Sequence, residues 1–347
     1  MFISTASDDE DDEPKDNKRD SFMLSQSGTF NLADFKINRA GMSEKSAPTP
    51  QPHPEGGAPV ILDVTSIEEL EIGEDLGVGA SGTVKKAKHK TTGMFVAVKQ
   101  IQILEKAKRD QMVKELRIMR THECPWLVSL YNTFYEDATV YMVLEFMDGG
   151  SLADVIAKNG PPQGAGEERK LAIMAMQMLN GLNYLHRQHH QVHRDLKPAN
   201  VLVNSRGQVK ISDFGISSQL DSTSGMCSTF VGTTCYMAPE RLNGGNYSYG
   251  ADIWSFGLII LEMLLGKYPY PTADNYFKLL SQIMDQPAPS VPEGLFSDEL
   301  AEFVGVCLDK DYRKRPSASD LLKHPWLRKH PTDDMLLSAS LEKMMIG

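Results

Sequence analysis

Cysteine is scarce in this sequence, which has only four in 347 residues. Their spacing fits neither a disulfide framework nor a set of zinc ligands. The chain also lacks any apolar run near the ~18 residues of a membrane-spanning helix, and its polar N-terminus has no signal-peptide core. We therefore expect free thiols, a cytoplasmic location with the nucleus also open, and no membrane partner. The four cysteines are Cys124, Cys227, Cys235 and Cys307.

An excess of basic charge is likewise missing. The chain has 46 acidic and 36 basic residues, which give a formal net charge of -10. Nucleic acids and anionic membranes attract basic surfaces, so neither is expected as a main partner. What the chain does have is a 41% content of hydrophobic residues, which at this length suffices for one large domain with tails.

Composition divides the chain into three parts. Residues 1–65 are rich in Ser, Asp, Lys, Pro and Gly; because they can bury little apolar surface, we predict a flexible N-terminal arm, although Phe35-Lys36-Ile37 alternates as a short strand would. Residues 66–327 carry the periodic pattern of a folded domain. Residues 328–347 form a tail whose apolar residues have helical spacing, and we expect it to pack on the domain, with docking of an activator as the alternative.

Strand patterns come first in the folded part and helical patterns follow. This order predicts the α+β class, with a small sheet-rich lobe, a larger helical lobe and a ligand cleft between them. The predicted strands are 67–76, 82–88, 94–100, 127–135 and 139–146. The predicted helices are 106–120, 152–158, 168–186, 251–265, 275–284, 298–308 and 318–324.

Two short runs carry the chemistry of phosphoryl transfer. The run V-H-R-D-L-K-P-A-N holds Asp195, Lys197 and Asn200, and the later S-D-F-G holds Asp213. A carboxylate at Asp195 can accept the proton of a hydroxyl nucleophile, and Lys197 can neutralise a transferring phosphoryl group. Asn200 and Asp213 supply oxygen ligands for Mg²⁺. Since both runs are complete and in order, we predict a protein kinase.

A glycine-rich run, G-V-G-A-S-G-T-V, occupies residues 77–84. Glycines let a backbone approach phosphate oxygens closely and aim its N–H groups at them. The same glycines occur in a dinucleotide-binding fingerprint, where a helix follows them. A strand pattern follows here, which favours the phosphate-covering loop of a kinase.

Lys99 ends the next predicted strand, and Glu115 lies on the helix predicted after it. In a kinase, Lys99 would hold the α- and β-phosphates and pair with Glu115. Taken alone, Lys99 could be a solvent-facing strand lysine, and Glu115 could belong to a solvated helix face. Their position between the glycine-rich run and the catalytic motifs favours the kinase roles.

Two carboxylates further along the chain are expected to support the site. Asp252, in D-I-W-S-F-G, would brace the catalytic loop, and Glu240, in M-A-P-E, would pair with Arg315. A buried carboxylate without such a partner would cost several kcal/mol. Surface ion pairing is the alternative for both groups.

These motifs identify the chain as a member of the protein kinase family over about residues 67–327, and within it the chain resembles the MAP kinase kinases. The runs M-D-G-G-S-L at 147–152, D-L-K-P-A-N-V-L-V-N at 195–204 and Y-M-A-P-E-R-L at 236–242 carry this resemblance. It implies a two-lobed enzyme that uses MgATP to phosphorylate Thr and Tyr in the activation loop of a downstream MAP kinase. An upstream MAP kinase kinase kinase would activate it. The nucleotide contacts that the resemblance implies are Leu76, Gly77, Val78, Gly79, Ala80, Ser81, Gly82, Thr83, Val84, Ala97, Lys99, the gatekeeper Leu144, and Glu145 and Met147 at the hinge.

The activation segment departs from the animal pattern, in which three residues separate the phosphorylated pair. Gly225 stands where the first member would be. Counting six positions back from Thr229 reaches Thr223, which is the spacing of plant-type members and indicates a plant, protist or oomycete-like lineage. We expect phosphorylation of Thr229 together with Thr223 or Ser224. Ser222 and Ser228 are further candidates for the first site.

A basic pair precedes hydrophobic residues in the arm. Lys18 and Arg19 are followed by Phe22 and Leu24, which suits an extended peptide whose cations meet an acidic patch while alternate side chains enter apolar pockets. We predict a docking motif for the MAP kinase, against the alternative of an ordinary stretch of flexible chain.

Two other functions stay open at this point. The chain could be a related kinase of the sterile-20 or MAP kinase kinase kinase type that acts on Ser and Thr only. It could also be a pseudokinase scaffold, although the presence of Lys99, Asp195, Asn200 and Asp213 disfavours this function.

Overall fold

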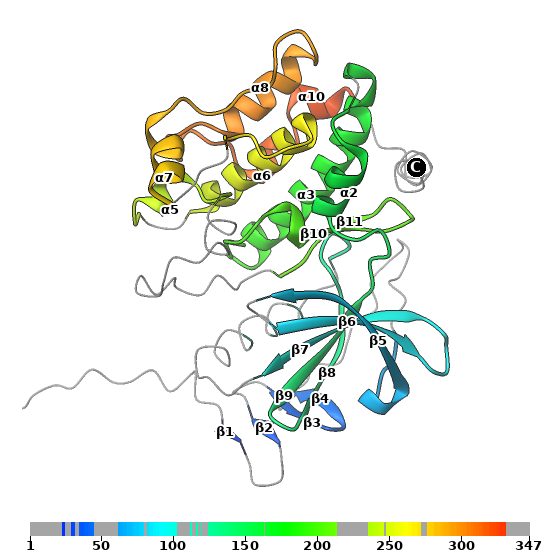
Figure 1. The fold of residues 1–347 in the computed structure, drawn as a ribbon. Coiled ribbons are helices and arrows are strands. Elements are labelled where there is room, and N and C mark those ends of the chain that lie inside the picture. The colour runs from blue at the N-terminus through cyan, green and yellow to red at the C-terminus, as the bar shows by residue number, and fades with distance from the viewer. Residues whose placement is uncertain are drawn as a thin grey trace, which may run out of the picture.

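The protein has a small strand-rich half and a larger helical half (Figure 1). This arrangement confirms the predicted two-lobed α+β fold.

Within the residues described here, no helix is both long and apolar enough to cross a membrane. The computed structural model describes residues 23–24, 29–31, 35–44, 62–79, 82–102, 112, 116, 119, 124–162, 164–213, 235–245, 248–271 and 276–330.

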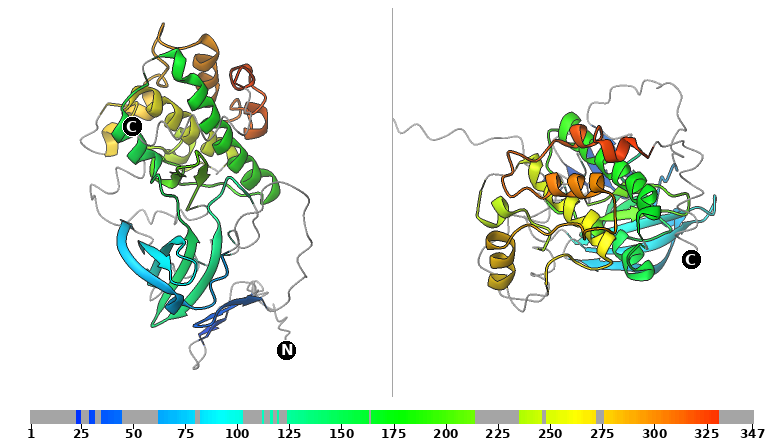
Figure 2. Two further views of the ribbon diagram at one scale, coloured as in Figure 1. Left: turned by 90° about the vertical axis from the view of Figure 1, so that its right-hand side faces the viewer. Right: turned by 90° about the horizontal axis from the view of Figure 1, so that it is seen from above.

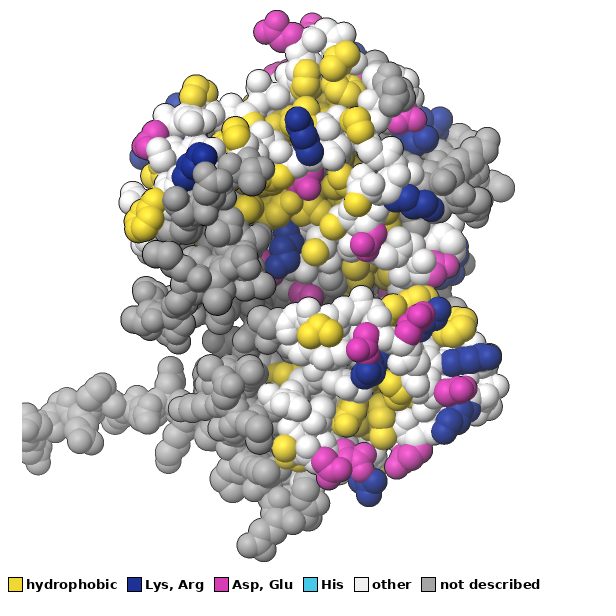
Figure 3. Space-filling model, in the orientation of Figure 1, with side chains coloured by type: hydrophobic (Ala, Val, Ile, Leu, Met, Phe, Trp, Pro, Cys, Tyr) yellow, Lys and Arg dark blue, Asp and Glu magenta, His cyan; other side chains and the backbone are white. Residues whose placement is uncertain are grey.

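An antiparallel five-stranded sheet forms most of the small half, in the order β5-β6-β7-β9-β8. Val96 and Val98 of β7 are fully buried, as alternation along a strand with one covered face requires. On the outer surface, acidic and basic side chains are mixed (Figure 3), and Lys86 of β6 lies 3.6 Å from Glu74 of β5. The strands are β5 (Leu70–Gly79), β6 (Gly82–His89), β7 (Phe95–Gln102), β8 (Leu130–Glu136) and β9 (Thr139–Glu145).

The first predicted strand, 67–76, begins three residues later than expected. Ile67–Glu69 instead form a short 3-10 helix, η2. The Ser66 side chain accepts a hydrogen bond from the Glu68 backbone N–H at 3.2 Å. Such a local cap offers the backbone a partner that competes with a strand ladder, and this explains the shift.

The N-terminal arm contains four short strands, which lie beside the main sheet (Figures 1 and 2). The prediction that residues 1–65 are flexible does not hold for these strands, whereas the short strand expected at 35–37 is confirmed. The average composition concealed one well-packed residue, Ile37, whose side chain is 0% exposed. Asn132 of β8 accepts a hydrogen bond from Met42 N–H at 3.1 Å and donates one to Val64 C=O at 2.7 Å. The strands are β1 (Met23–Leu24), β2 (Phe30–Asn31), β3 (Phe35–Asn38) and β4 (Gly41–Glu44).

Of the predicted helix at 106–120, the structure describes Met112, Leu116 and Met119, which are helical and buried. Their spacing of four and three residues puts them on one face of the helix. That face belongs to the buried apolar core.

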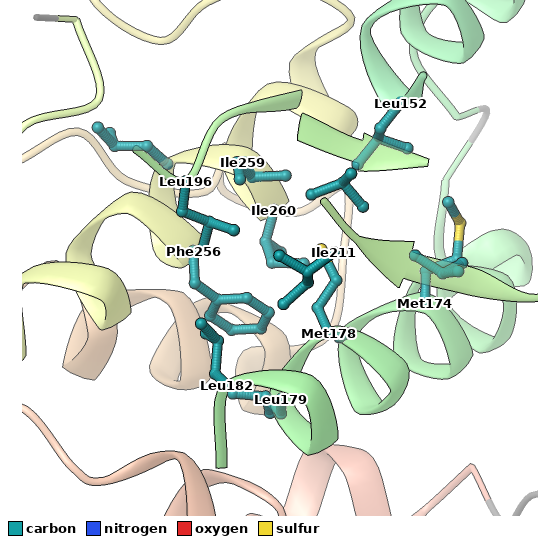
Figure 4. Close-up of a cluster of buried hydrophobic side chains, with 14 of the residues drawn as sticks. Leu152, Met174, Met178, Leu179, Leu182, Leu196, Ile211, Phe256, Ile259 and Ile260 are labelled. Atoms are coloured by element: carbon teal, nitrogen blue, oxygen red, sulfur yellow. The ribbon is translucent and has the colours of Figure 1, made fainter. Parts of the chain in front are cut away.

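The large half is built around α3 (Glu168–Gln188) and α6 (Tyr249–Leu265). Apolar side chains from both helices meet Leu196 of the catalytic run and Ile211 in the core (Figure 4). The core therefore anchors the segments that carry the catalytic motifs. The other helices are α2 (Leu152–Asn159), α5 (Pro239–Leu242), α7 (Tyr276–Asp285), α8 (Asp298–Cys307), α9 (Ala318–Leu321) and α10 (Pro325–Arg328).

A two-stranded sheet, β10 (Val201–Val203) and β11 (Val209–Ile211), packs on α3. The catalytic run leads into β10 through the short 3-10 helix η4 (Pro198–Asn200), and β11 leads directly to Ser212 and Asp213. Val201, Val209 and Ile211 are fully buried, so this small sheet holds both motifs at one place.

Candidate active site

Lys99 and Asp213 meet between the two halves of the molecule. The Lys99 ammonium Nζ lies 2.7 Å from Asp213 Oδ1, and the lysine side chain is only 2% exposed. Burial alone would raise the pKa of Asp213, but the charge of Lys99 and its hydrogen bond outweigh this effect and hold the pKa below its usual value. The strand lysine is therefore not solvent-facing, and it points at a carboxylate that stays ionised.

Asp195, Lys197 and Asn200 form one hydrogen-bonded group. Lys197 Nζ donates to Asp195 Oδ2 at 2.8 Å, and Asn200 Nδ2 donates to Asp195 Oδ2 at 3.0 Å and to its backbone C=O at 2.7 Å. Pro198 starts η4 and turns the chain so that Asn200 reaches back to Asp195. The Asp195 carboxylate is half-buried, so a hydroxyl substrate can still approach it.

Asp252 of α6 braces the catalytic loop at His193 and Arg194, as predicted. Its carboxylate accepts hydrogen bonds from the backbone N–H groups of His193, at 2.7 Å, and Arg194, at 3.0 Å. His186 Nε2 lies 2.8 Å from the same carboxylate. Arg194 has φ +73°, a left-handed conformation that is costly for arginine and needs such support.

Asn200 and Asp213 fit the two oxygen ligands expected for a divalent metal ion. The Ser212 backbone N–H and hydroxyl both donate to Asn200 C=O, at 2.9 and 3.1 Å, which ties the two ligand-bearing segments together. The Asn200 amide nitrogen is engaged with Asp195, so its side-chain oxygen is the atom presented to a metal. In the described part of the chain no cluster of three His, Cys, Asp or Glu side chains could hold a metal alone.

The glycine-rich run joins β5 to β6 as a hairpin, with Gly79 opposite Gly82. Gly82 has φ +132°, and an added Cβ would lie 2.1 Å from the Gln100 carbonyl oxygen. Only glycine fits this position. Because a strand and not a helix follows, the dinucleotide-binding alternative is wrong. Leu76 and Val78 of this hairpin are exposed, Val78 by 77%.

Strand pairing places the other nucleotide residues around the same region. Thr83 and Val84 of β6 lie opposite Gln100 and Lys99, and Ala97 lies opposite Leu144. Leu144 and Glu145 end β9, and the chain then continues through Met147 into the large half. The predicted nucleotide residues therefore lie on the neighbouring strands β6, β7 and β9 and on the connection between the two halves.

Several predicted site residues lie outside the described residues, so their predictions stand without a structural account. Of the four predicted docking residues, Leu24 is the one that the structure describes; it lies in β1 and pairs with Phe30. The predicted site residues outside the description are Lys18, Arg19, Phe22, Ala80, Ser81, Glu115, Thr223, Ser224 and Thr229.

The Glu240–Arg315 pair is confirmed as a buried bidentate contact. Arg315 Nη1 and Nη2 lie 2.8 and 2.9 Å from the two Glu240 oxygens, and Arg315 Nη1 also donates to Gly250 C=O at 2.8 Å. This pair fixes α5, which follows the activation segment, to the start of α6. A bidentate, buried contact of this kind sets position as well as charge balance.

Two supporting residues were missed from the sequence. His186 near the end of α3 contacts Asp252, and Lys210 in β11 contacts Glu145. A lysine between two apolar strand residues, Val209 and Ile211, is a signal that could have singled out Lys210. His186 offers no comparable signal, because it reaches Asp252 across the fold, 66 positions along the chain.

The sequence is similar to those of known proteins over most of its length. The protein kinase domain family matches residues 70–327. Mitogen-activated protein kinase kinase 2 of Arabidopsis thaliana is 42% identical over 88% of this chain and 85% of its own length. Mitogen-activated protein kinase kinase 1c of Physcomitrium patens is 41% identical over 94% and 96%, and the dual specificity mitogen-activated protein kinase kinase dSOR1 of Drosophila melanogaster is 39% identical over 81% and 76%. The chain is an ATP-dependent protein kinase and belongs to the MAP kinase kinases.

Proposed function

We propose that this kinase phosphorylates both the Thr and the Tyr of a MAP kinase activation loop, using MgATP. The observation that carries the proposal is the meeting of Lys99 with Asp213 beside the Asp195 group, in a chain whose relatives are MAP kinase kinases. Asn200 and Asp213 offer only hard oxygen ligands, which suit Mg²⁺.

Asp195 orients the substrate hydroxyl and accepts its proton as the phosphorus–oxygen bond forms. Lys197, held 2.8 Å from Asp195, stabilises the negative charge of the transferring phosphoryl group. Lys99 holds the remaining phosphates while Asp213 and Asn200 supply the metal ligands. Because phosphoryl transfer depends mainly on positioning and charge, these prearranged groups supply most of the catalysis.

The experiment is transfer of radiolabelled γ-phosphate to a catalytically inactive MAP kinase, followed by mapping of the labelled residues. Label on both Thr and Tyr of the activation loop supports the proposal. Label on Ser or Thr alone would favour the sterile-20 or MAP kinase kinase kinase type. Absence of label, with ATP binding intact, would favour the pseudokinase scaffold.

Activation is proposed to follow phosphorylation of Thr229 together with Thr223 or Ser224 by an upstream MAP kinase kinase kinase. Each phosphate adds about -1.5 to -2 of charge, which an arginine can pair with. Arg194, adjacent to Asp195 in a loop fixed by Asp252, is the arginine proposed to receive it. Mass spectrometry of the activated enzyme tests this, and an active enzyme without phosphate on Thr229 would contradict it.

The free state of Cys124, Cys235 and Cys307 supports a reducing, cytoplasmic location, with the nucleus also open. Microscopy of the tagged full-length chain tests this proposal.

A further inference from the structure

A buried ion pair joins the hinge to the large half of the molecule. Lys210 Nζ lies 2.7 Å from Glu145 Oε2, and the two side chains are 7% and 13% exposed. Glu145 is the last residue of β9, where the chain leaves the small half. Lys210 is the central residue of β11, between the fully buried Val209 and Ile211. Neither charged group belongs to the catalytic set around Asp195.

A third segment is held by the same contacts. The Glu145 backbone N–H donates to Ser129 C=O at 2.9 Å, and the Ser129 N–H donates to Glu145 Oε2 at 3.3 Å. The Val128 N–H donates to Ile211 C=O at 3.0 Å. The segment before β8, the hinge and β11 are therefore fastened to one another at one place.

Strand β11 also leads to the phosphate end of the site. Asp213, the metal ligand and partner of Lys99, is three residues after Lys210. The hinge, at the other end of the pair, is the adenine side of the site in this family. The spacing between the adenine side and the phosphate side of the site thus depends on how β11 is joined to the hinge. The Lys210–Glu145 ion pair joins them directly, and the backbone hydrogen bonds of Val128 and Ser129 join them through the segment before β8.

We infer that Lys210 is a positioning residue for ATP, which acts through Glu145 to hold the hinge at a fixed place relative to Asp213. A buried pair rarely adds more stability than well-packed apolar residues would, but it fixes direction and distance. In the dry interior the attraction is strong, and removal of one partner leaves the other charge unpaired. The hinge would then no longer be held at a fixed distance from β11, and the affinity of the site for ATP would fall.

The test compares Lys210→Met, Glu145→Gln, the double variant and Lys210→Arg in the full-length enzyme. The readouts are the KM for MgATP, kcat on a generic protein substrate, the Kd of a fluorescent ADP analogue and the Tm. The single variants Lys210→Met and Glu145→Gln are each expected to raise KM and Kd about fivefold or more, with a smaller change in kcat. Coupling between two sites of a protein commonly changes the affinity for a ligand by at least this factor. Lys210→Arg keeps the charge and should stay near the wild-type values.

The double variant separates positioning from stability. It leaves no unpaired charge, so its Tm should recover relative to the single variants, while its KM and Kd stay as high as theirs. Val291→Ala is the matched control, because it removes buried apolar contacts in the large half and should lower the Tm without changing KM.

Recovery of KM and Kd in the double variant, in step with Tm, would overturn the inference and leave the pair as a stabilising contact. Unchanged KM and Kd in Lys210→Met, or tighter nucleotide binding, would overturn it as well. The inference rests on the kinase activity and on none of the proposed MAP kinase specificity. A failure to phosphorylate a MAP kinase would therefore leave this test readable.

Discussion

At the scale of single residues, the site consists of charged groups that are held in place by hydrogen-bonded partners. Lys99 reaches Asp213 from the small half, and Lys197 and Asn200 hold the Asp195 carboxylate. The sequence motifs predicted these residues because each role needs one residue type at one spacing. They could not predict the partner of Asp252 on α3, because His186 approaches it through the packing of two helices.

Asp195→Asn and Lys99→Met are each expected to abolish phosphoryl transfer in a folded protein. An amide cannot accept the hydroxyl proton, and loss of such a base costs about 10²–10⁴-fold in kcat. A thioether at position 99 cannot neutralise phosphate charge, which costs about 10²–10³-fold. Single-turnover assays with circular dichroism as a folding control measure this. Turnover near that of the wild type in either variant contradicts the assigned roles.

Asp252→Asn is expected to lower both stability and kcat. The amide group can accept at only one of its two positions, so one of the His193 and Arg194 N–H groups loses its acceptor at a cost of about 1–3 kcal/mol. Arg194 then lacks support for its strained conformation, and Asp195 beside it moves. Thermal unfolding and steady-state kinetics measure the two effects. Unchanged kcat would show that Asp252 does not brace the loop.

The pH dependence of stability gives a second readout on Asp252. Burial favours a raised pKa, but the hydrogen bond and charge of His186, the charge of His193 and the Arg194 backbone N–H outweigh it and hold the pKa of Asp252 below its usual value. A carboxylate with a depressed folded-state pKa contributes stability above its unfolded pKa, and this stability is lost as the pH falls below about 4 through the folded value. Asp252→Asn should therefore flatten this acid limb in unfolding measurements. A limb as steep as that of the wild type would assign it to other carboxylates.

At the scale of elements, the sequence predicted most strands and helices to within a few residues, because their periodic apolar faces pack on one core. The N-terminal hairpin β3–β4 was missed as an ordered unit. Its packing depends on Asn132, about 90 positions away, which receives Met42 N–H and also ties down Val64. A long-range hydrogen bond of this kind leaves no local pattern in the sequence.

Ile37→Asp is expected to detach this hairpin and lower the free energy of unfolding by about 2–5 kcal/mol, since it places a charge at a fully buried apolar position. Lys36→Asp, one residue away on an exposed position, is the matched control and should be nearly neutral. Thermal unfolding of the two variants measures the difference. Equal melting temperatures would show that the hairpin adds nothing to the small half.

At the scale of the whole molecule, substrate recognition is expected to be divided between the folded domain and the arm that precedes it. Residues 18–24 carry the predicted docking motif, and Leu24 lies in the short strand β1. Docking at a distance raises the local concentration of the substrate loop without altering the active site. The charged and hydrophobic residues of the motif suit an acidic, grooved partner surface, and the family of this kinase indicates that the partner is a MAP kinase.

Replacement of Lys18, Arg19, Phe22 and Leu24 by Ala is expected to raise the KM for an intact MAP kinase several-fold, by about the factor that tethering supplies. Activity on a short peptide should not change, because a peptide does not use the docking contact. Parallel kinetic assays on the two substrates provide the measurement. Equal kinetics on the intact MAP kinase before and after replacement would reduce the motif to a linker.

This kinase is expected to switch on a MAP kinase by phosphorylating two residues of its activation loop. The most direct measurement is the activity of a purified MAP kinase towards its own substrate after incubation with the activated enzyme and MgATP. We predict strong activation, abolished by Lys99→Met in the enzyme and by replacement of either the Thr or the Tyr in the MAP kinase loop. Full activation of a MAP kinase whose loop Tyr is replaced by Phe, or none of the unaltered one, would contradict the account.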